Sequence, residues 1–450
     1  MMHLMKDNSE LPLNQGDYQS FKLGENSYKK QVKYEEAVKK VVPASEIYQA
    51  YKDIKKYVRR TPLTFAQKFS ERYGAKIYFK REDFQMTGTY KIRGAFNRLL
   101  NLTDQQKANG VICATQGNQG ASLGFACQQL GIKAIIVMPD TVPTDKSNHV
   151  LRFQGKNTQV IMHGINLNES INYAHELSKQ KGMTLVSFED SDIIRGCGSV
   201  AVEILEDMPE QKIDYIMFSM SSGSLASGVG SYVYQLSPET QQIGVEHEVE
   251  DQSENNRCQV PAQNLYESQQ QLLETFPLEE KNILSVIIDG LYKVGEGAAC
   301  SAVTTLYNQE KIVIEPFSAV CPAALEQIKD EIKGKTVVCI LCGSFRYDIA
   351  RLSEIRTISS VYEHKLFFIL VSFFSKKGSL KIFLRDFLGP EDDIHMINYT
   401  RKNNREKGPA LVGIESPNEA EFNKILEKLS NKKIDYKIVK PSDPLFKLKV

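Results

Sequence analysis

The chain has 450 residues, with 56 Lys and Arg against 55 Asp and Glu. This balance argues against nucleic acid or an anionic membrane as the main partner and favours a small molecule. No stretch reaches the roughly 18 consecutive apolar residues of a membrane span, and eight dispersed cysteines favour a reducing compartment, the cytoplasm or the mitochondrial matrix, over secretion.

Residues 1–42 are predicted to be a polar N-terminal extension, because they lack the apolar segment of a signal sequence. Within residues 43–352, short apolar runs alternate with helical patterns, which is typical of a parallel sheet covered by helices. The expected strands are residues 77–80, 111–114, 134–138, 158–162, 184–188, 215–220, 243–246 and 336–341. The expected helices include residues 121–130, 167–180, 199–205 and 224–236. This order predicts a doubly wound α/β fold, in which ligands bind beyond the carboxyl ends of the strands.

Two regions depart from this pattern. Residues 248–281 are rich in Gln, Glu and Asn and are predicted to be a surface excursion. A helical linker, residues 353–364, is expected to lead to a separate C-terminal unit, residues 365–450. That unit is predicted to contain strands 366–373, 394–400 and 410–415 and helices 379–387 and 419–429. Their βαββα order is typical of a small ferredoxin-like α+β module.

The segment Lys80-Arg-Glu-Asp-Phe-Gln-Met-Thr-Gly-Thr-Tyr-Lys91-Ile-Arg-Gly-Ala places a lysine at the start of a helix, after a strand and a small-residue turn. A helix start helps to lower the pKa of a lysine. Such an amine can form an imine with the aldehyde of pyridoxal phosphate (PLP) and move protons at a substrate carbon. Taken alone, Lys91 would more simply be one of many surface lysines on an amphipathic helix.

A second loop follows the predicted strand 111–114 and opens the next helix. It consists of Thr115, Gln116, Gly117, Asn118 and Gln119. Backbone N–H groups at a helix start suit a carboxylate or a phosphate, although Gly-Asn is also a common turn.

Two more segments follow predicted strands. The loop after strand 215–220 consists of Ser221, Ser222, Gly223, Ser224 and Leu225, and Cys342 follows strand 336–341. Cys339 and Cys342 have the spacing of a zinc-binding pair, but they face opposite sides of a strand and no second pair exists. The seven histidines are dispersed, so we expect no metal site.

These segments together resemble the PLP-dependent amino-acid ammonia-lyases and, most closely, the threonine dehydratases. The resemblance includes Lys-Ile-Arg-Gly-Ala at Lys91, Glu296-Gly-Ala-Ala-Cys-Ser and Glu315-Pro, and extends from about Ala44 to the C-terminus. The C-terminal unit resembles the ACT-like regulatory domain of short-form biosynthetic threonine dehydratases. The resemblance implies PLP fold type II, with two doubly wound parallel-sheet subdomains in a catalytic domain over residues 43–352.

The resemblance also implies a role for each segment. Lys91 would carry PLP and remove the α-proton, and Tyr90 stands beside the cofactor where the family usually has Phe. Asn118 would contact the cofactor ring, and Cys342 would face the pyridine nitrogen. The cofactor phosphate would be held by Ser221, Ser222, Gly223, Ser224 and Leu225. The substrate carboxylate would be held by Thr115, Gln116, Gly117 and Gln119.

The implied activity is elimination that converts L-threonine to 2-oxobutanoate and ammonia, with L-serine processed by the same route. The C-terminal domain would bind an amino-acid effector or mediate assembly into a homo-oligomer or a larger complex. Departures from the family pattern motivate an alternative, a non-catalytic descendant that acts as a structural subunit. Of four glycines in the family's phosphate loop only Gly223 remains, and residues 344–347 are bulkier than in the family. A Cβ at a position that needs positive φ costs on the order of 1 kcal/mol or more.

Overall fold

The computed structural model describes residues 41–187, 190–248, 278–343, 349–374, 377–399, 407–441 and 443–447. The predicted N-terminal extension therefore lies outside the described residues, apart from Val41 and Val42. These two valines are buried in the core. The Val42 N–H donates to Ser231 Oγ at 3.2 Å, and Gln235 donates to the Val42 carbonyl at 2.8 Å. The packed body therefore includes the last two residues of the predicted extension.

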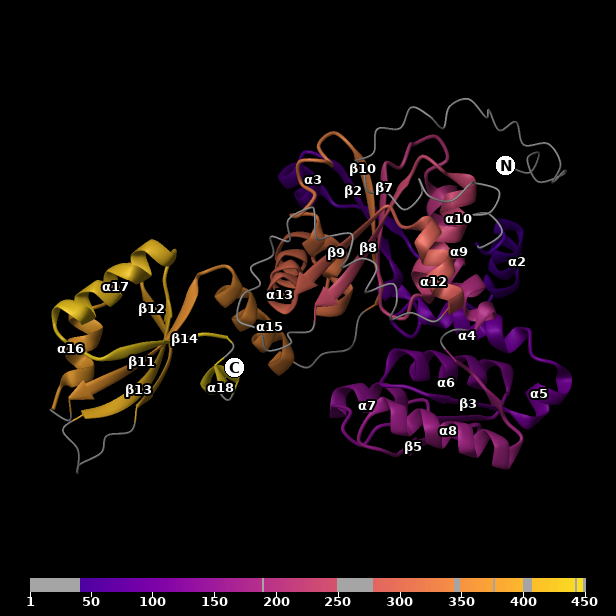
Figure 1. The fold of residues 1–450 in the computed structure, drawn as a ribbon, viewed down its shortest axis with the longest axis horizontal. Coiled ribbons are helices and arrows are strands. Elements are labelled where there is room, and N and C mark those ends of the chain that lie inside the picture. Colours follow the sequence, from indigo (N-terminus) through magenta and orange to yellow (C-terminus); the bar gives the residue numbers. More distant parts are fainter. Residues whose placement is uncertain are drawn as a thin grey trace.

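The larger of two α/β units is built on a six-stranded sheet with the order β1-β2-β10-β7-β8-β9, shown at the upper right of Figure 1. Only the β1–β2 pair is antiparallel, and every other neighbouring pair is parallel. The strands are β1 Leu63–Phe65, β2 Lys76–Arg81, β7 Tyr215–Ser219, β8 Gln241–Glu248, β9 Gly290–Gly295 and β10 Thr336–Leu341. The helices of this unit are α2 Ala44–Ile54, α3 Gln67–Tyr73, α4 Lys91–Leu100, α9 Ser191–Asp207, α10 Ser224–Leu236, α12 Leu278–Ile287, α13 Glu296–Thr305 and α14 Val320–Ala324. Short single turns are η3 Glu82–Phe84, η4 Leu306–Glu310 and η5 Pro316–Ser318.

The smaller unit has a four-stranded parallel sheet with the order β5-β4-β3-β6 and lies below the larger one in Figure 1. Its strands are β3 Val111–Ala114, β4 Ala134–Met138, β5 Thr158–Met162 and β6 Thr184–Leu185. Its helices are α5 Asp104–Asn109, α6 Asn118–Leu130, α7 Thr144–Leu151 and α8 Leu167–Lys181. β3 and β4 are buried along their whole length, which is why they read as continuous apolar runs in the sequence.

Three helices of the larger unit cross at glycines. A Cβ on Gly196 of α9 would lie 2.5 Å from the Arg93 carbonyl oxygen of α4. A Cβ on Gly228 of α10 would lie 2.3 Å from the Ile194 carbonyl oxygen of α9. Only a residue without a side chain allows backbones to approach this closely. Through α9, helix α4, which begins at Lys91, is thus held at a fixed distance from α10. Helix α10 follows the loop of residues 221–225, called the serine-rich loop below.

The C-terminal unit is an antiparallel sheet with the order β12-β13-β11-β14, and α16 and α17 lie together on one side of it in Figure 1. Its elements are β11 Leu366–Phe374, α16 Ser379–Asp386, β12 Asp393–Tyr399, β13 Lys407–Glu415, α17 Glu419–Asn431, β14 Tyr436–Val439 and α18 Pro444–Lys447. Most of the predicted helical linker, residues 353–364, lies in α15, Ile349–Tyr362, which is packed against α13. Ser301 of α13 donates to Glu363 at 2.7 Å, and the Tyr362 ring lies against Gly297.

The fold class is the predicted one, and the differences are local. β1, β9 and β14 were not predicted, because β1 and β14 have only three and four residues and β9 lacks a continuous apolar run. The helix expected at 199–205 begins at Ser191 instead, since Asp190 caps its N-terminus by accepting a bond from the Asp192 N–H. Of the predicted surface excursion, residues 249–277 lie outside the described residues, and Leu278 begins α12. No helix among the described residues is long and apolar enough to cross a bilayer.

Candidate active site

The order of the large sheet brings three predicted segments to one edge. β10 lies between β2 and β7, and all three strands are parallel. The chain leaves β2 toward Lys91, leaves β10 at Cys342 and leaves β7 toward Ser221. Because the carboxyl ends of parallel strands meet at one edge, these segments converge although they are far apart in the sequence.

The residues before Lys91 are bonded to the end of β10. The Tyr90 N–H donates to the Cys342 carbonyl at 3.3 Å, and Thr89 Oγ1 donates to the same oxygen at 3.2 Å. Thr89 and Gly343 also form an isolated antiparallel bridge. These contacts fix the start of α4 beside Cys342. The predicted crowding by residues 344–347 concerns positions outside the described residues.

A buried charge cluster anchors the first turn of α4 through Arg93. Arg93 donates to both oxygens of Glu82 at 2.9 and 2.8 Å and to both oxygens of Glu203 at 2.7 and 2.9 Å. Lys80 donates to Glu203 at 2.8 Å. All four side chains are at most 1% exposed. Lys80, Glu82 and Arg93 belong to the motif around Lys91, so part of that motif is structural.

Lys91 is the first residue of α4 and is partly buried. Burial lowers the pKa of its amine, while Cys197, Glu315 and Cys342 act in the opposite direction. A lowered lysine pKa increases the fraction of neutral amine, which is the form that acts as a nucleophile and base.

Glu315 is a site residue that the sequence reasoning missed. It lies just before η5 and is 7% exposed, and its Oε1 accepts from Asn118 Nδ2 at 3.3 Å and from Ser318 Oγ at 3.4 Å. Burial raises the pKa of Glu315 to about 7, although Lys146, Lys91, Asn118 and Ser318 oppose the shift. The Glu-Pro motif was noted in the sequence, but no local pattern indicates that its carboxyl is buried and bonded to Asn118.

The loop of the smaller unit meets the larger unit through Asn118, the first residue of α6. Thr115 is buried, and its Oγ1 accepts from the Gly117 N–H at 3.1 Å and from the Gly120 N–H at 3.3 Å. The Thr115 hydroxyl oxygen therefore orders this loop. Gln119 is buried and Gln116 is exposed.

The serine-rich loop resolves the concern about lost glycines. Gly223 has φ +80°, whereas no serine of this loop is among the described non-glycine residues with positive φ. The backbone thus takes the left-handed conformation only where the glycine remains. Ser224 and Leu225 are buried at the start of α10, and Ser222 Oγ lies 2.9 Å from Ser224 Oγ. Side-chain hydroxyls therefore line a loop that also ends in a helix N-terminus.

Cys342 is 4% exposed, and its Sγ lies 2.8 Å from Ser219 Oγ. Burial raises the pKa of the Cys342 thiol to about 11, although Ser219 opposes the shift. The thiol is therefore neutral at physiological pH.

The buried polar atoms at this edge fit a cofactor such as PLP. Asn118 Oδ1 and Gln119 Nε2, at the start of α6, are buried and have no hydrogen-bond partner. Such groups are normally satisfied, so they indicate that a polar ligand belongs here. The donor set is also suitable, with an amine at Lys91, hydroxyls at Ser222 and Ser224 and a neutral thiol at Cys342. Among the residues that the structure describes, no group of three or more His, Cys, Asp or Glu side chains is placed to hold a metal.

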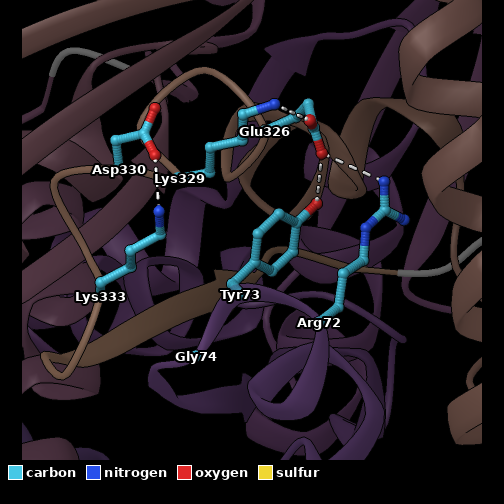
Figure 2. Close-up of a pocket in the computed structure, with 7 residues that line it drawn as sticks. All are labelled: Arg72, Tyr73, Gly74, Glu326, Lys329, Asp330 and Lys333. Carbon is cyan, nitrogen blue, oxygen red and sulfur yellow. Dashed lines mark hydrogen bonds and ion pairs between the residues drawn. The ribbon is translucent and has the colours of Figure 1, made fainter.

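The pocket in Figure 2 is not this site. It is lined by Arg72, Tyr73, Gly74, Glu326, Lys329, Asp330 and Lys333 and has a volume of about 620 Å³. Gly74 and Lys333 lie beside the amino ends of β2 and β10, opposite to the edge that carries Lys91. Its charged side chains are already paired, as the dashed lines show.

Comparisons with known proteins identify the family. Residues 54–343 match the pyridoxal-phosphate dependent enzymes, and residues 357–448 match the C-terminal regulatory domain of threonine dehydratase. Biosynthetic L-threonine dehydratase of Halalkalibacterium halodurans is 36% identical over 422 residues, covering 90% of this chain and 99% of that protein. The chain belongs to the PLP-dependent threonine dehydratase family. The Bacillus subtilis biosynthetic L-threonine dehydratase is 35% identical, covering 91% and 97% of the two chains.

Solved structures agree with this family. The processed form of threonine deaminase isoform 2 from Solanum lycopersicum has a TM-score of 0.60 and 25% identity, covering 71% of this chain and 90% of that chain. Maize serine racemase has a TM-score of 0.61 and 25% identity, covering 72% and 98%. The predicted family, the fold-type II architecture and the PLP dependence are thereby confirmed.

Proposed function

We propose that this protein converts L-threonine to 2-oxobutanoate and ammonia and accepts L-serine by the same route. The observation that carries the proposal is the position of Lys91, which begins α4 at the carboxyl edge of the large sheet, directly after the residue whose N–H is bonded to Cys342. Burial lowers the pKa of its amine there. The relatives named threonine dehydratase, which match over nine tenths of this chain, support the choice of substrate.

PLP, when bound, supplies an electron sink that makes the α-hydrogen of an amino acid acidic. The neutral Lys91 amine accepts the α-proton, which its lowered pKa favours. The substrate carboxylate is bound at the start of α6, where helix N–H groups and the loop of Thr115, Gln116, Gly117 and Gln119 surround it. The β-hydroxyl leaves as water, and hydrolysis of the released enamine yields the oxo acid and ammonia.

Residues of four segments would hold the cofactor. Asn118 would contact the ring from the smaller unit, Tyr90 would lie beside it, and Cys342 would face the ring nitrogen as a neutral partner. The phosphate is bound by the loop of Ser221, Ser222, Gly223, Ser224 and Leu225. This assignment is supported by the helix N-terminus that follows the loop and by the hydroxyl pair of Ser222 and Ser224.

The C-terminal domain is proposed to bind an amino-acid effector and to contribute to a homo-oligomer. Its match to a regulatory domain supports the first part, and the packing of α15 on α13 provides a direct contact with the catalytic domain. The bacterial relatives favour the cytoplasm over the mitochondrial matrix.

The non-catalytic alternative rested on lost glycines and on the bulky residues 344–347, which lie outside the described residues, and no observation favours it. The loop takes positive φ only at Gly223, so its serines need no strained backbone. The parallel order β2-β10-β7 also brings the segments that carry Lys91, Cys342 and Ser222 to one edge of the sheet.

The test combines cofactor binding with turnover. The purified protein should gain visible absorbance on addition of PLP, and that absorbance should change when L-threonine is added. Lys91→Ala should lose both the absorbance and the release of 2-oxobutanoate, whereas Lys76→Ala, at an exposed lysine where β2 begins, should keep both. A wild-type protein that stays colourless, or a Lys91→Ala variant with unchanged turnover, would refute the proposal.

A further inference from the structure

Glu315 is a buried acid that has no task in the proposed chemistry. It is 7% exposed and lies directly before η5. Its backbone is fixed, because the Glu315 carbonyl accepts from the Ser318 N–H at 2.9 Å and from the Ala319 N–H at 3.1 Å. Pro316 follows, and its ring restricts the chain further. The carboxyl group of Glu315 therefore projects from a rigid turn.

This carboxyl group joins the larger unit to the smaller one. Glu315 Oε1 accepts from Asn118 Nδ2 of the smaller unit at 3.3 Å and from Ser318 Oγ of its own turn at 3.4 Å. An ionised carboxyl group has only acceptors, and the carbonyl oxygen of a protonated one accepts as well. In either state, Glu315 can hold the Asn118 amide by its nitrogen. At the other end of the amide, Asn118 Oδ1 is buried and has no hydrogen-bond partner within the part of the chain that the structure describes.

Asn118 lies on the face of α6 that meets the larger unit. It is the first residue of α6, and Ser122, one turn later, lies on the same face. Ser122 Oγ lies 3.3 Å from Thr87 Oγ1, and both residues are fully buried. Thr87 belongs to the turn that leads to Lys91. The start of α6 is therefore connected to the larger unit by two polar contacts, one at Glu315 and one beside the lysine segment.

The bond to Glu315 orders a side chain before any ligand arrives. An asparagine side chain rotates unless it is bonded, and ordering it at the moment of binding weakens affinity. A bond that already exists in the apoprotein avoids this cost. Because an amide donates only through nitrogen and accepts only through oxygen, the bond to Glu315 also decides what remains for a ligand. Asn118 keeps its buried Oδ1 and its second N–H.

We propose that Glu315 is a positioning residue that holds the Asn118 amide, across the two units, in the orientation that contacts the cofactor. This inference rests on the proposed function, because the contact between Asn118 and the cofactor ring is part of it. The Glu315-Pro segment, which resembles the family without an assigned chemistry, thereby gains a role in cofactor binding. Glu315 acts only through Asn118.

The decisive pair of variants is Glu315→Met and Glu315→Gln. Methionine has a similar length but no oxygen, so it cannot hold the Asn118 amide, whereas glutamine keeps an acceptor oxygen. The Kd for PLP, measured by absorbance titration of the apoprotein, should rise roughly tenfold in Glu315→Met, as expected for the loss of one buried hydrogen bond. Glu315→Gln should bind PLP like the wild type. The matched control, Glu326→Met, makes the same chemical change in the pocket of Figure 2 and should also bind PLP like the wild type.

A double-mutant cycle separates a positioning role from a direct contact. Asn118→Ala removes the amide and should weaken PLP binding by itself. Adding Glu315→Met to Asn118→Ala should cause no further loss of affinity, because the group that Glu315 holds is already absent. Two losses that multiply would show that Glu315 acts on the cofactor directly or through the fold as a whole.

An exchange of donor and acceptor tests the same bond without Glu315→Met. Asn118→Asp replaces the amide by a carboxyl group and places two acids together, so it should weaken PLP binding. Combining it with Glu315→Gln again pairs one amide with one carboxyl group, and most of the lost affinity should return. Combining Asn118→Asp with Glu326→Gln, at the remote pocket, should restore nothing.

The results separate the two proposals. If the wild-type protein does not bind PLP, the proposed function fails and the inference fails with it. If the wild type binds PLP and Glu315→Met binds it equally well, the proposed function stands and the inference about Glu315 is wrong. A Glu315→Gln variant as weak as Glu315→Met would also overturn the inference, since the charge and not the acceptor oxygen would then matter. If Glu315→Met does not fold, the exchange decides: recovery of affinity supports the inference, and its absence refutes it.

Discussion

Replacing Arg93 by methionine should destabilise the protein strongly, because it breaks a buried cluster of balanced charge. In the native cluster, the cations of Arg93 and Lys80 face the carboxylates of Glu82 and Glu203, and all four side chains are at most 1% exposed. Arg93→Met keeps an unbranched side chain in place but leaves two buried carboxylates with one buried cation. Removing one partner of a buried pair costs about 3–5 kcal/mol. Urea unfolding of the apoprotein, followed by circular dichroism, measures this loss.

The pH dependence provides a second check on Arg93. Burial alone would raise the pKa of Glu203, but Arg93 and Lys80 lower it below its usual value. A carboxyl with a lowered folded-state pKa contributes stability above its unfolded pKa of about 4.3, and this contribution is lost as the pH falls through the folded pKa. Arg93→Met removes the contribution. The stability difference between wild type and variant should therefore be largest near neutral pH and should shrink in acid.

A surface arginine serves as the control. Arg72 pairs with Glu326 at 3.1 Å, but the two side chains are 51% and 47% exposed. Arg72→Met should cost less than about 1 kcal/mol. If Arg93→Met costs no more than this control, or if its effect is independent of pH, the charge cluster does not hold α4 in the way described here.

Two further variants test the helix crossing and the buried acid. Gly228→Ala places a Cβ 2.3 Å from the Ile194 carbonyl oxygen and should cost about 1–3 kcal/mol of stability and weaken PLP binding, whereas Gly155→Ala, which meets open space, should do neither. Equal urea midpoints for the two variants would contradict the close approach. Burial raises the pKa of Glu315 to about 7, so the apoprotein should lose up to about 3 kcal/mol of stability as the pH rises from the unfolded value near 4.3 to 7. Glu315→Gln should lack this loss in pH-dependent unfolding curves, and an unchanged slope would show that Glu315 is not the titrating group.

Sequence patterns predicted the skeleton of the site well. Lys91, the loop at Asn118, the serine-rich loop and Cys342 all follow strands that were predicted within a residue or two of their observed ends. Such strands are buried apolar runs with polar residues directly after them, and this pattern is local. The missed strands are edge strands, of which β1 has three residues, β14 has four and β9 has six with polar residues and glycines among them. Edge strands bury little side-chain area and leave a weak pattern.

The residue types alone determined that this chain is an α/β protein with a lysine at a helix start, because side-chain period and helix-start chemistry are properties of neighbouring residues. Only the tertiary structure decided which groups surround that lysine. The buried acid Glu315, the bond from the Tyr90 N–H to the Cys342 carbonyl and the charge cluster at Arg93 all depend on the order β2-β10-β7 and on helices that touch at glycines. Strand order is set by long-range packing, and the pKa of a buried group is set by whatever charges that packing places next to it.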